Sequence, residues 1–521
     1  MSGASDELLL AIDCGTQSVR ALLVDLKGDI VAKRQTALDG YVSAESGWLE
    51  HDAEAFWRAS ASVCRGLLAE AADLRGRTKG VVVTAQRGSL TLVDAGGNPL
   101  RPFIIWLDQR RARRKPAIPM WWRGAFLAAR VSGTIDYLVK ESELNWIAEH
   151  EPERLARTHK ALLVSGWLNY RLTGRFADSV GSQVGYIPFD YKRHAWARPW
   201  DWKWSALAVR RDQMPDLVQV GSVLGTVTRD AAEATGLPPG LPVIAGAADK
   251  ACEILGAGAT TPDIGAISYG TTATINVTMS RYLEATPFIP PYPAALPGQF
   301  IAEVQIFRGF WMVSWFKQQF GHPEVAAALD EGVTPEALFD RLVQAAPPGS
   351  EGLMLQPYWT PGVRSPGPEA RGAMIGFTDA HTRAHLFRAI LEGLAYALRE
   401  GCERIQAKSG VAVTSLRVSG GGSQSDAAMQ VTSDIFNRPA SRAHTFETSG
   451  LGAAIVGAVG LGLHRDFSSA VGEMTRLGRT FEPNPAHAAL YDELYAHVYK
   501  RMYRRLAPLY LELRRTLRRA P

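Results

Sequence analysis

An apolar strand that runs directly into a short turn rich in glycine and threonine occurs twice in this chain, once in each half. Residues 8–14 lead into the turn Gly15–Ser18 and a second apolar run, and residues 264–269 lead in the same way into Gly270–Thr272. Two apolar runs joined by such a turn predict a β-hairpin. The turn directs backbone N–H groups and hydroxyls at one spot, which is the arrangement that binds a phosphate. The two copies therefore predict two lobes that hold the phosphates of a nucleotide between them.

The length and composition of the chain indicate a globular protein with two domains. At 521 residues the chain is too long for a single hydrophobic core. We expect one domain over residues 1–254 and the other over residues 255–521. Hydrophobic residues make up 46% and charged residues 21%, which is ordinary for a soluble protein. The net charge of +5 is too small for this length to indicate a nucleic-acid partner.

No segment of the sequence indicates secretion or membrane insertion. The first residues include acidic side chains and only a short apolar stretch, unlike a signal peptide. The most apolar run, residues 449–463, is shorter than the roughly 20 residues of a spanning helix, so we expect a buried helix there. The four cysteines lie far apart and indicate neither a zinc site nor disulfides. We expect a cytoplasmic protein without membrane or nucleic-acid partners, assembled as a homodimer or a higher homo-oligomer.

Segments typical of strands and of helices alternate along both halves. In the first half, residues 80–84 and 242–248 are apolar runs typical of buried strands, and the second run ends at Asp249. In the second half, residues 416–419 lead through three consecutive glycines into a segment with helical periodicity. Strand–turn–helix units in both halves predict an α/β fold of two related domains, with the ligand site at their junction.

Four further expectations concern segments outside these motifs. The proline-rich stretch 287–297 is expected to be an exposed loop. A long helix is expected to begin with Asp379 as its cap. The basic C-terminal stretch is expected to be a helix that packs on its own domain and that Pro508 kinks or restarts. The run of cations from Arg110 to Lys115 is expected to lie on the solvated surface.

Three turns and two carboxylates carry the predicted chemistry. The turns are Gly15–Ser18, Gly270–Thr272 and Gly420–Gly422, and none of them is a P-loop. Phosphoryl transfer needs positioning, charge neutralisation and a base for the attacking hydroxyl. Asp249, at the end of an apolar strand, fits the role of that base and equally that of a helix N-cap. Asp13 is a candidate ligand for Mg²⁺, and Arg20 either contacts a phosphate or lies on the surface.

Longer motifs carry a resemblance to a known family. The segments DCGTQSVRA (residues 13–21), AGAADKACEILGAGA (245–259), SYGTT (268–272) and GGGSQSDAAMQVTSDIFNRPA (420–440) resemble the FGGY family of carbohydrate kinases. The similarity extends over nearly the whole chain in the order of the family. It implies the actin-like ATPase (ribonuclease H-like) fold in both domains, ATP and Mg²⁺ as cosubstrates, and closure of the two lobes over a small-molecule sugar or polyol.

The same resemblance assigns roles to individual residues. Asp249 matches the catalytic aspartate, which favours the base over the N-cap, and Asp13 lies beside the metal. The positions that match nucleotide-contacting residues, or lie in the matching loops, are Thr16, Gln17, Ser18, Arg20, Gly270, Thr271, Gly309, Gly421, Gly422 and Ser425.

The substrate-contacting positions match the family less uniformly. They are Gln86, Arg87, Trp106, Asp108, Asp249 and Lys250. Glycerol kinases resemble the chain at the Gln-Arg pair but carry Glu where this chain has Gly88. Xylulokinases have Met-His-Gly in this loop, which the chain does not match. Because a site built around a substrate hydroxyl discriminates strongly, such changes indicate a different acceptor.

Two further positions depart from the glycerol kinase pattern. Lys250 stands where glycerol kinases have Gln, and Leu138 aligns with their glycerol-binding tyrosine, with Tyr137 one position away. A Lys250 that faces the site would bind an acidic or multiply hydroxylated sugar, whereas the alternative is a paired charge at the rim. The sequence thus predicts an ATP-dependent kinase for an open-chain polyol or ketose. The alternatives are glycerol kinase proper and a non-catalytic sugar or nucleotide sensor of the same fold.

Overall fold

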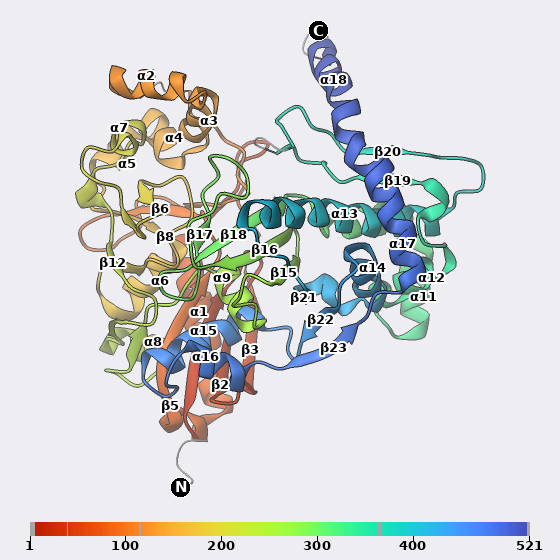
Figure 1. Cartoon of the computed structure of the whole chain (residues 1–521). Helices are drawn as coiled ribbons and strands as arrows, with labels where there is room; N and C mark the ends of the chain where they lie inside the picture. Colours follow the sequence, from red (N-terminus) through yellow and green to blue (C-terminus); the bar gives the residue numbers. More distant parts are fainter. Residues whose placement is uncertain (1–5, 39, 114–115, 363–365, 518–521) are drawn as a thin grey trace.

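Two mixed β-sheets, one from each half of the chain, form the centres of two lobes in the computed structural model (Figure 1). The structure describes residues 6–38, 40–113, 116–362 and 366–517. In Figure 1 most of the first half, coloured red to yellow, lies to the left, and most of the second half, coloured teal to blue, lies to the right.

The first sheet has six strands in the order β13-β14-β5-β1-β2-β3. Its strands are β1 (Leu8–Cys14), β2 (Ser18–Asp25), β3 (Ile30–Ala37), β5 (Thr78–Ala85), β13 (Val223–Thr226) and β14 (Pro242–Ile244). β1, β2 and β3 are successively antiparallel, whereas β5 is parallel to both β1 and β14. The predicted first hairpin is therefore confirmed as β1–β2. Because β1, β5 and β14 are parallel, the residues that follow them meet at one edge of the sheet.

The second sheet has seven strands in the order β17-β18-β16-β15-β21-β22-β23. Its strands are β15 (Ile264–Tyr269), β16 (Ala273–Met279), β17 (Tyr292–Pro293), β18 (Phe300–Ile306), β21 (Ser415–Ser419), β22 (Ala440–Ala443) and β23 (Leu477–Phe481). β18, β16 and β15 are successively antiparallel, and β21 and β22 continue parallel to β15. This repeats the order and directions of β3, β2, β1, β5 and β14, so the two lobes share one topology, as the sequence predicts.

Smaller sheets and helices complete both lobes. The short strands are β4 (Glu50–His51), β6 (Leu90–Val93), β7 (Phe103–Ile104), β8 (Lys160–Leu163), β9 (Ala177–Ser179), β10 (Phe189–Asp190), β11 (Ala195–Trp196), β12 (Asp216–Val218), β19 (Met354–Gln356) and β20 (Ala373–Ile375). The helices of the first half are α1 (Ala53–Glu70), α2 (Met120–Ala128), α3 (Ser132–Glu141), α4 (Glu143–His150), α5 (Pro152–Ala156), α6 (Val164–Thr173), α7 (Trp202–Ala206), α8 (Arg229–Thr235) and α9 (Asp249–Gly256). Those of the second half are α10 (Trp311–Phe320), α11 (His322–Glu331), α12 (Pro335–Ala345), α13 (Arg383–Ser409), α14 (Asp426–Phe436), α15 (Thr448–Gly460), α16 (Phe467–Met474), α17 (Pro485–Leu494) and α18 (Lys500–Leu517).

Both faces of the first sheet are buried. Leu8 and Leu10 of β1 pack in one apolar cluster with residues of α1 and α6, and Leu9 and Ala11 pack in another with residues of α15. A strand that is buried on both faces is apolar along its whole length. This explains why the sequence of β1 is a continuous apolar run rather than an alternation.

Helix α15 belongs to the second half of the chain but packs against β1, β5 and α9 of the first lobe (Figure 1). A Cβ atom on Gly452 would lie 1.9 Å from the carbonyl oxygen of Cys252, so only glycine permits this close approach of α15 to α9. The expected buried helix within residues 449–463 is confirmed, and its small residues serve this contact. No helix among the described residues has both the length and the apolar character to cross a membrane. The division of the chain at residue 254 stays a prediction.

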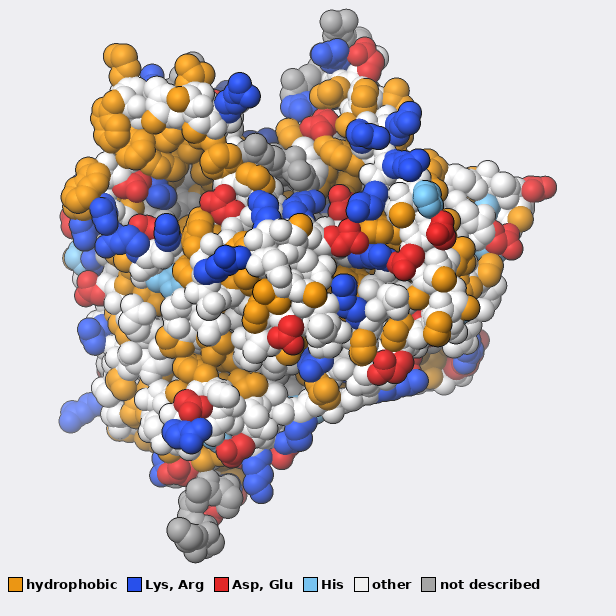
Figure 2. Space-filling view, in the orientation of Figure 1, with side chains coloured by type: hydrophobic (Ala, Val, Ile, Leu, Met, Phe, Trp, Pro, Cys, Tyr) orange, Lys and Arg blue, Asp and Glu red, His pale blue; other side chains and the backbone are white. Residues whose placement is uncertain are grey.

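Helix α2 carries apolar side chains on the surface of the first lobe. Figure 2 shows them gathered at the upper left, over the place that α2 has in Figure 1. Met120, Trp121 and Leu127 of this helix are all exposed. The homo-oligomer that we expect from the sequence stays a prediction.

Three expectations about local structure are wrong in whole or in part. The stretch 287–297 is not simply an exposed loop, because it adds β17 to the edge of β18 and buries Ala294 and Ala295 beside residues of α9. The long helix α13 begins at Arg383 with Thr382 as its N-cap, instead of at Asp379. Helix α18 continues through Pro508, so it does not restart there, and the alternative of a kink stays a prediction. Its last turns project from the lobe in Figure 1, where Pro508 is exposed and water can satisfy the carbonyl that a proline leaves without a partner.

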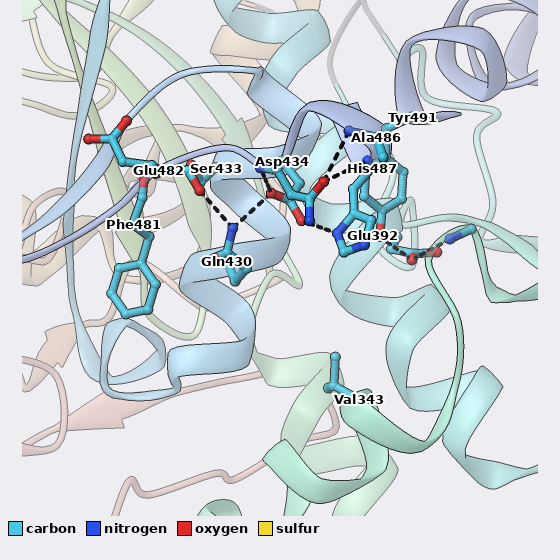
Figure 3. Close-up of polar contacts among 12 residues, drawn as sticks. Val343, Glu392, Gln430, Ser433, Asp434, Phe481, Glu482, Ala486, His487 and Tyr491 are labelled. Atoms are coloured by element: carbon cyan, nitrogen blue, oxygen red, sulfur yellow. Dashed lines mark hydrogen bonds and ion pairs between the residues drawn. The ribbon is translucent and has the colours of Figure 1, made fainter. Parts of the chain in front are cut away.

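Buried carboxylates fasten helix α17 to the second lobe (Figure 3). Asp434 of α14 accepts hydrogen bonds from the side chain of Gln430 and the backbone of Asn484, both at 2.8 Å, and its other oxygen lies 2.9 Å from Nδ1 of His487. Glu392 of α13 accepts the hydroxyl hydrogen of Tyr491 at 2.7 Å. Helix α17 is thereby tied to α13 and α14 of the same lobe.

Candidate active site

Asp249 lies where β14 is followed by α9, at the shared edge of the parallel strands. It is the first residue of α9, whose N-cap is Ala248. Its Oδ1 accepts the backbone N–H of Lys250 at 2.7 Å. Burial raises the pKa of Asp249 above its usual range, and the positive charges of Arg87 and Lys250 oppose that shift. A carboxylate with a raised pKa is a stronger base, as proton abstraction from a hydroxyl requires.

Asp13, near the end of β1, is a second buried carboxylate at the same edge. Burial raises its pKa to about 7, Arg20 lowers it, and the charge of Asp249 adds to the rise. Arg20 Nη1 donates to Oδ2 of Asp13 at 3.1 Å, and its Nε lies 3.5 Å from Glu447. Arg20 is therefore held by two carboxylates, close to the turn of the first hairpin.

The first predicted phosphate turn is short and hydrogen-bonded. The N–H of Gly15 donates to the carbonyl of Ser18 at 3.0 Å, and Gln17 is exposed at the tip. Trp106 Nε1 donates to the hydroxyl of Thr16 at 3.0 Å. This hydrogen bond joins the predicted phosphate turn to the predicted substrate segment.

Gly309 packs against the backbone of the second predicted phosphate turn. The N–H of Gly270 donates to the carbonyl of Thr272 at 3.0 Å, and Thr271 is exposed. The carbonyl of Gly270 accepts the N–H of Phe310 at 3.1 Å. Gly309 is buried directly under this turn, so its backbone supports the hairpin.

We expect Gly309→Ala to weaken ATP binding. A Cβ atom at this position would lie 2.1 Å from the backbone nitrogen of Ala273, and a backbone atom cannot move away as a flexible side chain can. The turn must therefore shift, which should cost about 1–3 kcal/mol of unfolding free energy and raise the KM for ATP. Thermal denaturation and initial rates measure both. The control is Gly472→Ala, because a Cβ atom there would meet no atom within 4 Å. Equal KM values for wild type and Gly309→Ala would contradict this account of the turn.

The third glycine turn connects β21 to α14. Gly421 is exposed, and a Cβ atom there would meet no atom within 4 Å, whereas Gly422 lies against the ring of Phe310. Ser425 is the N-cap of α14, where its hydroxyl accepts the N–H of Ala428 at 3.0 Å and donates to Asp340. Phe310 thus packs beside the third turn and bonds to the second, which brings the two together.

The loop after β5 holds the first two predicted substrate residues. Gln86 is buried and bonded to protein groups, because it donates to the carbonyls of Cys14 and Gly15 in the first hairpin and accepts the hydroxyl of Ser89 in its own loop. Arg87 instead reaches the second lobe, where its two terminal nitrogens donate to the two carboxylate oxygens of Glu303 at 3.1 and 3.2 Å.

Asp108 is tightly held by neighbouring groups. Its oxygens accept the Nε and Nη2 of Arg110 at 2.9 and 2.7 Å and the backbone N–H of Leu49 at 2.6 Å. Arg110 also donates to Glu50 at 2.7 Å, and its guanidinium carbon lies 4.3 and 4.5 Å from the ring centroids of Trp48 and Trp146.

The expectation that the cation run from Arg110 to Lys115 is solvated is therefore wrong for Arg110. Its side chain is only 2% exposed because carboxylates and indole rings surround it. Arg111 and Arg113 are exposed as expected. Arg114 and Lys115 lie outside the described residues.

Lys250 is a paired charge rather than a free one. Its ammonium group contacts the carboxylate of Glu253, one turn along α9, and donates to the hydroxyl of Ser268 at 2.6 Å. Glu253 also accepts the hydroxyl of Ser419 at 2.6 Å. Although burial raises the pKa of Glu253, Lys250 and the two serines bring it below its usual range. The network joins α9 of the first lobe to β15 and β21 of the second.

Sequence reasoning missed the partners that come from distant segments. Glu303, Tyr292 and Glu253 each contact a predicted site residue. The i, i+3 spacing of Lys250 and Glu253 is the one local signal that was present. The structure brings together four of the predicted site residues near the end of β14, namely Asp13, Asp249, Arg87 and Lys250. The polar groups of Gln86 and Asp108 instead form hydrogen bonds with other protein groups. Among the described residues, no group of three or more His, Cys, Asp or Glu side chains is placed to hold a metal ion.

The sequence matches two family models. One is the N-terminal domain of the FGGY family of carbohydrate kinases, over residues 8–256, and the other is the C-terminal domain of that family, over residues 265–461.

Curated relatives match over almost their full length. The chain is 29% identical over 500 residues to the uncharacterized sugar kinase YgcE of Escherichia coli (strain K12), covering 94% of this chain and 92% of the relative. It is 27% identical over 490 residues to a xylulose kinase of Lactococcus lactis subsp. lactis (strain IL1403), covering 94% and 95%. It is 28% identical over 497 residues to a glycerol kinase of Dechloromonas aromatica (strain RCB), covering 93% and 95%.

Solved structures share the fold. A xylulose kinase from Rhodospirillum rubrum superposes with a TM-score of 0.81 at 27% identity, covering 97% of this chain and 100% of that one. A gluconate kinase from Lactobacillus acidophilus superposes with a TM-score of 0.80 at 21% identity, covering 97% and 99%, and this likeness concerns the fold alone.

Proposed function

This chain belongs to the FGGY family of carbohydrate kinases, and we propose that its acceptor is an open-chain polyol or ketose whose hydroxyl is deprotonated by Asp249. That it is an ATP-dependent carbohydrate kinase follows from the family. The identity of the acceptor and the roles of individual residues are the proposal. The observation that carries it is the environment of Asp249, a buried carboxylate with a raised pKa beside Arg87 and Lys250.

In the proposed reaction, Asp249 accepts the proton of one acceptor hydroxyl while that oxygen attacks the γ-phosphorus of ATP. The bond between the γ-phosphorus and the bridging oxygen breaks, and ADP leaves. Thr16, Gln17, Ser18, Arg20, Gly270 and Thr271 would bind the phosphates, and Gly309, Gly421, Gly422 and Ser425 would position the nucleotide. Most of the rate enhancement then comes from positioning and charge neutralisation.

The carboxylates at this edge fit a bound Mg²⁺. Mg²⁺ prefers oxygen ligands and is often held by one or two carboxylates together with phosphates. Burial raises the pKa of Asp13 to about 7, and the charge of Asp249 contributes, so a divalent cation would stabilise both anions. Asp13 would hold the ion. The bound Mg²⁺ would neutralise negative charge on the phosphates of ATP.

The acceptor class is inferred from what surrounds the substrate loop. Leu138 packs with the apolar cluster that contains Ile135 and Val139, so it offers no hydroxyl partner. Tyr137 lies beside Tyr186, with 6.5 Å between ring centroids. Trp106 offers an apolar face for a carbon chain. Together with Gly88, these residues favour an acceptor other than glycerol.

Specificity constants for a panel of acceptors test this proposal. The panel contains glycerol, a tetritol, pentitols, hexitols and ketopentoses, assayed by ADP release with Mg²⁺-ATP. We expect a C4 to C6 polyol or ketose to have a higher kcat/KM than glycerol. A far higher kcat/KM for glycerol would favour glycerol kinase proper. If nucleotide binds but no acceptor is phosphorylated, a non-catalytic sensor is favoured.

The rate should fall on acidification at a higher pH than an ordinary aspartate would give. The base must be deprotonated, and burial raises the pKa of Asp249, so its active form is lost as pH falls through that raised value. We expect log(kcat/KM) to lose one unit per pH unit below this pKa. Tryptophan fluorescence over the same range controls for unfolding. A profile that stays flat down to about pH 4 would contradict the raised pKa.

A further inference from the structure

We propose that Glu303 is a specificity-determining residue that neutralises Arg87 and thereby restricts the acceptor site to uncharged polyols and ketoses, excluding sugar acids. The inference rests on the proposed function, because it assumes that the acceptor binds beside Asp249 and Arg87. It extends that function by naming the charge of the substrate and the residue that selects for it.

The contact between Arg87 and Glu303 has the geometry of a complete bidentate pair. Both terminal nitrogens of Arg87 donate, one to each carboxylate oxygen, at 3.1 and 3.2 Å. The side chain of Glu303 is 4% exposed and that of Arg87 is 18% exposed. Tyr292 lies against the guanidinium group, whose carbon is 5.0 Å from the ring centroid. Glu303 comes from β18 of the second lobe, so the pair also bridges the two lobes.

This pair neutralises the charge with which Arg87 would otherwise attract a substrate carboxylate. A free arginine recognises a carboxylate through two parallel N–H groups. Here Glu303 already accepts that pair of hydrogen bonds. Arginine has five N–H donors in all, so donors remain for the oxygen of a neutral hydroxyl. A neutral hydroxyl can accept from these donors, whereas a substrate carboxylate would bring a second negative charge to a guanidinium group whose charge Glu303 already neutralises.

The second cation beside the catalytic carboxylate is neutralised in the same way. Arg87 and Lys250 are the two cations that act most strongly on Asp249. Lys250 contacts Glu253, so each cation has its own carboxylate. When Asp249 is counted with Glu303 and Glu253, the site holds three carboxylates and only these two cations. An anionic acceptor would add a fourth negative charge in a desolvated site, and uncompensated like charges are strongly unfavourable there.

A purely structural role for the pair makes a different prediction. If the pair only joined the two lobes, its loss would lower the stability of the protein and change the rate with every acceptor by the same factor. A charge filter changes the ratio between anionic and neutral acceptors. The discriminating quantity is therefore a ratio of specificity constants, which a general loss of activity leaves unchanged.

The test uses D-gluconate and D-glucitol, which share one carbon skeleton and differ in charge. In the wild-type protein, we expect D-gluconate to bind at least about ten-fold more weakly than D-glucitol in calorimetry. In Glu303→Gln, which keeps the shape of the side chain and removes its charge, we expect the gluconate-to-glucitol ratio of kcat/KM to rise about ten-fold or more. Glu303→Asp retains the charge and should retain the neutral preference.

The matched control is Glu324→Gln. Glu324 accepts the two terminal nitrogens of Arg383 at 2.8 and 3.1 Å, so it forms a similar partly buried pair at another place in the second lobe. This variant should leave the ratio unchanged.

The inference is overturned if wild type binds D-gluconate as tightly as D-glucitol, or if Glu303→Gln leaves the ratio unchanged. If Glu303→Gln does not fold, the calorimetric comparison of D-gluconate and D-glucitol binding to the wild-type protein still tests the inference. A protein that phosphorylates no polyol or ketose would contradict the proposed function, but the same calorimetric comparison would still show whether the site rejects a carboxylate. The two failures are therefore distinguishable.

Discussion

Replacing Asp249 by asparagine is expected to lower kcat for sugar phosphorylation by about 10³-fold while leaving ATP affinity nearly unchanged. Asparagine has almost the same size as aspartate but cannot accept the proton of the attacking hydroxyl. Stability should not fall. Burial raises the pKa of Asp249, so the folded state disfavours the charged carboxylate, and a neutral side chain removes that cost. Single-turnover rates, ATP titration by calorimetry and thermal denaturation measure the three quantities.

The control for this variant is Asp216→Asn. Asp216 is exposed on the short strand β12, so its substitution should change none of the three quantities. If Asp249→Asn keeps more than about a tenth of wild-type kcat, Asp249 is not the general base. A parallel loss of ATP affinity would instead assign Asp249 to nucleotide or metal binding.

Replacing Arg110 by alanine is expected to destabilise the first lobe by about 3–5 kcal/mol, because it leaves buried carboxylates without their partner. Arg110 bonds to Asp108 and Glu50, and its guanidinium carbon lies 4.3 and 4.5 Å from the ring centroids of Trp48 and Trp146. Asp108 would lose its two hydrogen bonds from the guanidinium group and keep those from backbone N–H groups such as that of Leu49, so the KM for the acceptor should rise as well. Urea denaturation gives the free energy of unfolding, and initial rates give KM.

The control for Arg110→Ala is Arg113→Ala, three residues along the chain. The side chain of Arg113 is exposed, so we expect a change within about 0.5 kcal/mol. Arg110→Lys tests the geometry, because a lysine keeps the charge but cannot form the planar bidentate contact with Asp108. If all three variants have the stability of wild type, Arg110 does not hold the substrate segment in place.

The features that the sequence predicts well are those encoded within a few consecutive residues. The two hairpins follow from apolar runs on either side of a Gly-Thr turn, and Ser425 precedes α14 as an N-cap residue should. The repeated strand order follows from the same hairpin occurring in each half. The buried helix α15 follows from its small residues, although its place against the first sheet does not.

The features that the sequence does not predict depend on distant segments meeting in space. A run of cationic residues is typical of a solvated surface, and nothing in the neighbouring sequence indicates that Trp48 and Trp146 both contact Arg110. The sequence predicts that Arg87 binds the substrate, and it gives no sign of the ion pair with Glu303, which lies on β18 of the other lobe. The proline-rich stretch reads as an exposed loop because its pairing partner, β18, lies outside the segment itself. Tertiary pairing decides each of these cases.

The central claim is that this kinase transfers the γ-phosphate of ATP to an open-chain polyol or ketose. Phosphorus NMR of the complete reaction tests it most directly, because the spectrum shows where the phosphate goes. We predict that a phosphomonoester of a C4 to C6 acceptor appears in step with ADP, and that Asp249→Asn abolishes it. Inorganic phosphate as the sole product, or phosphorylation of glycerol alone, would contradict the claim.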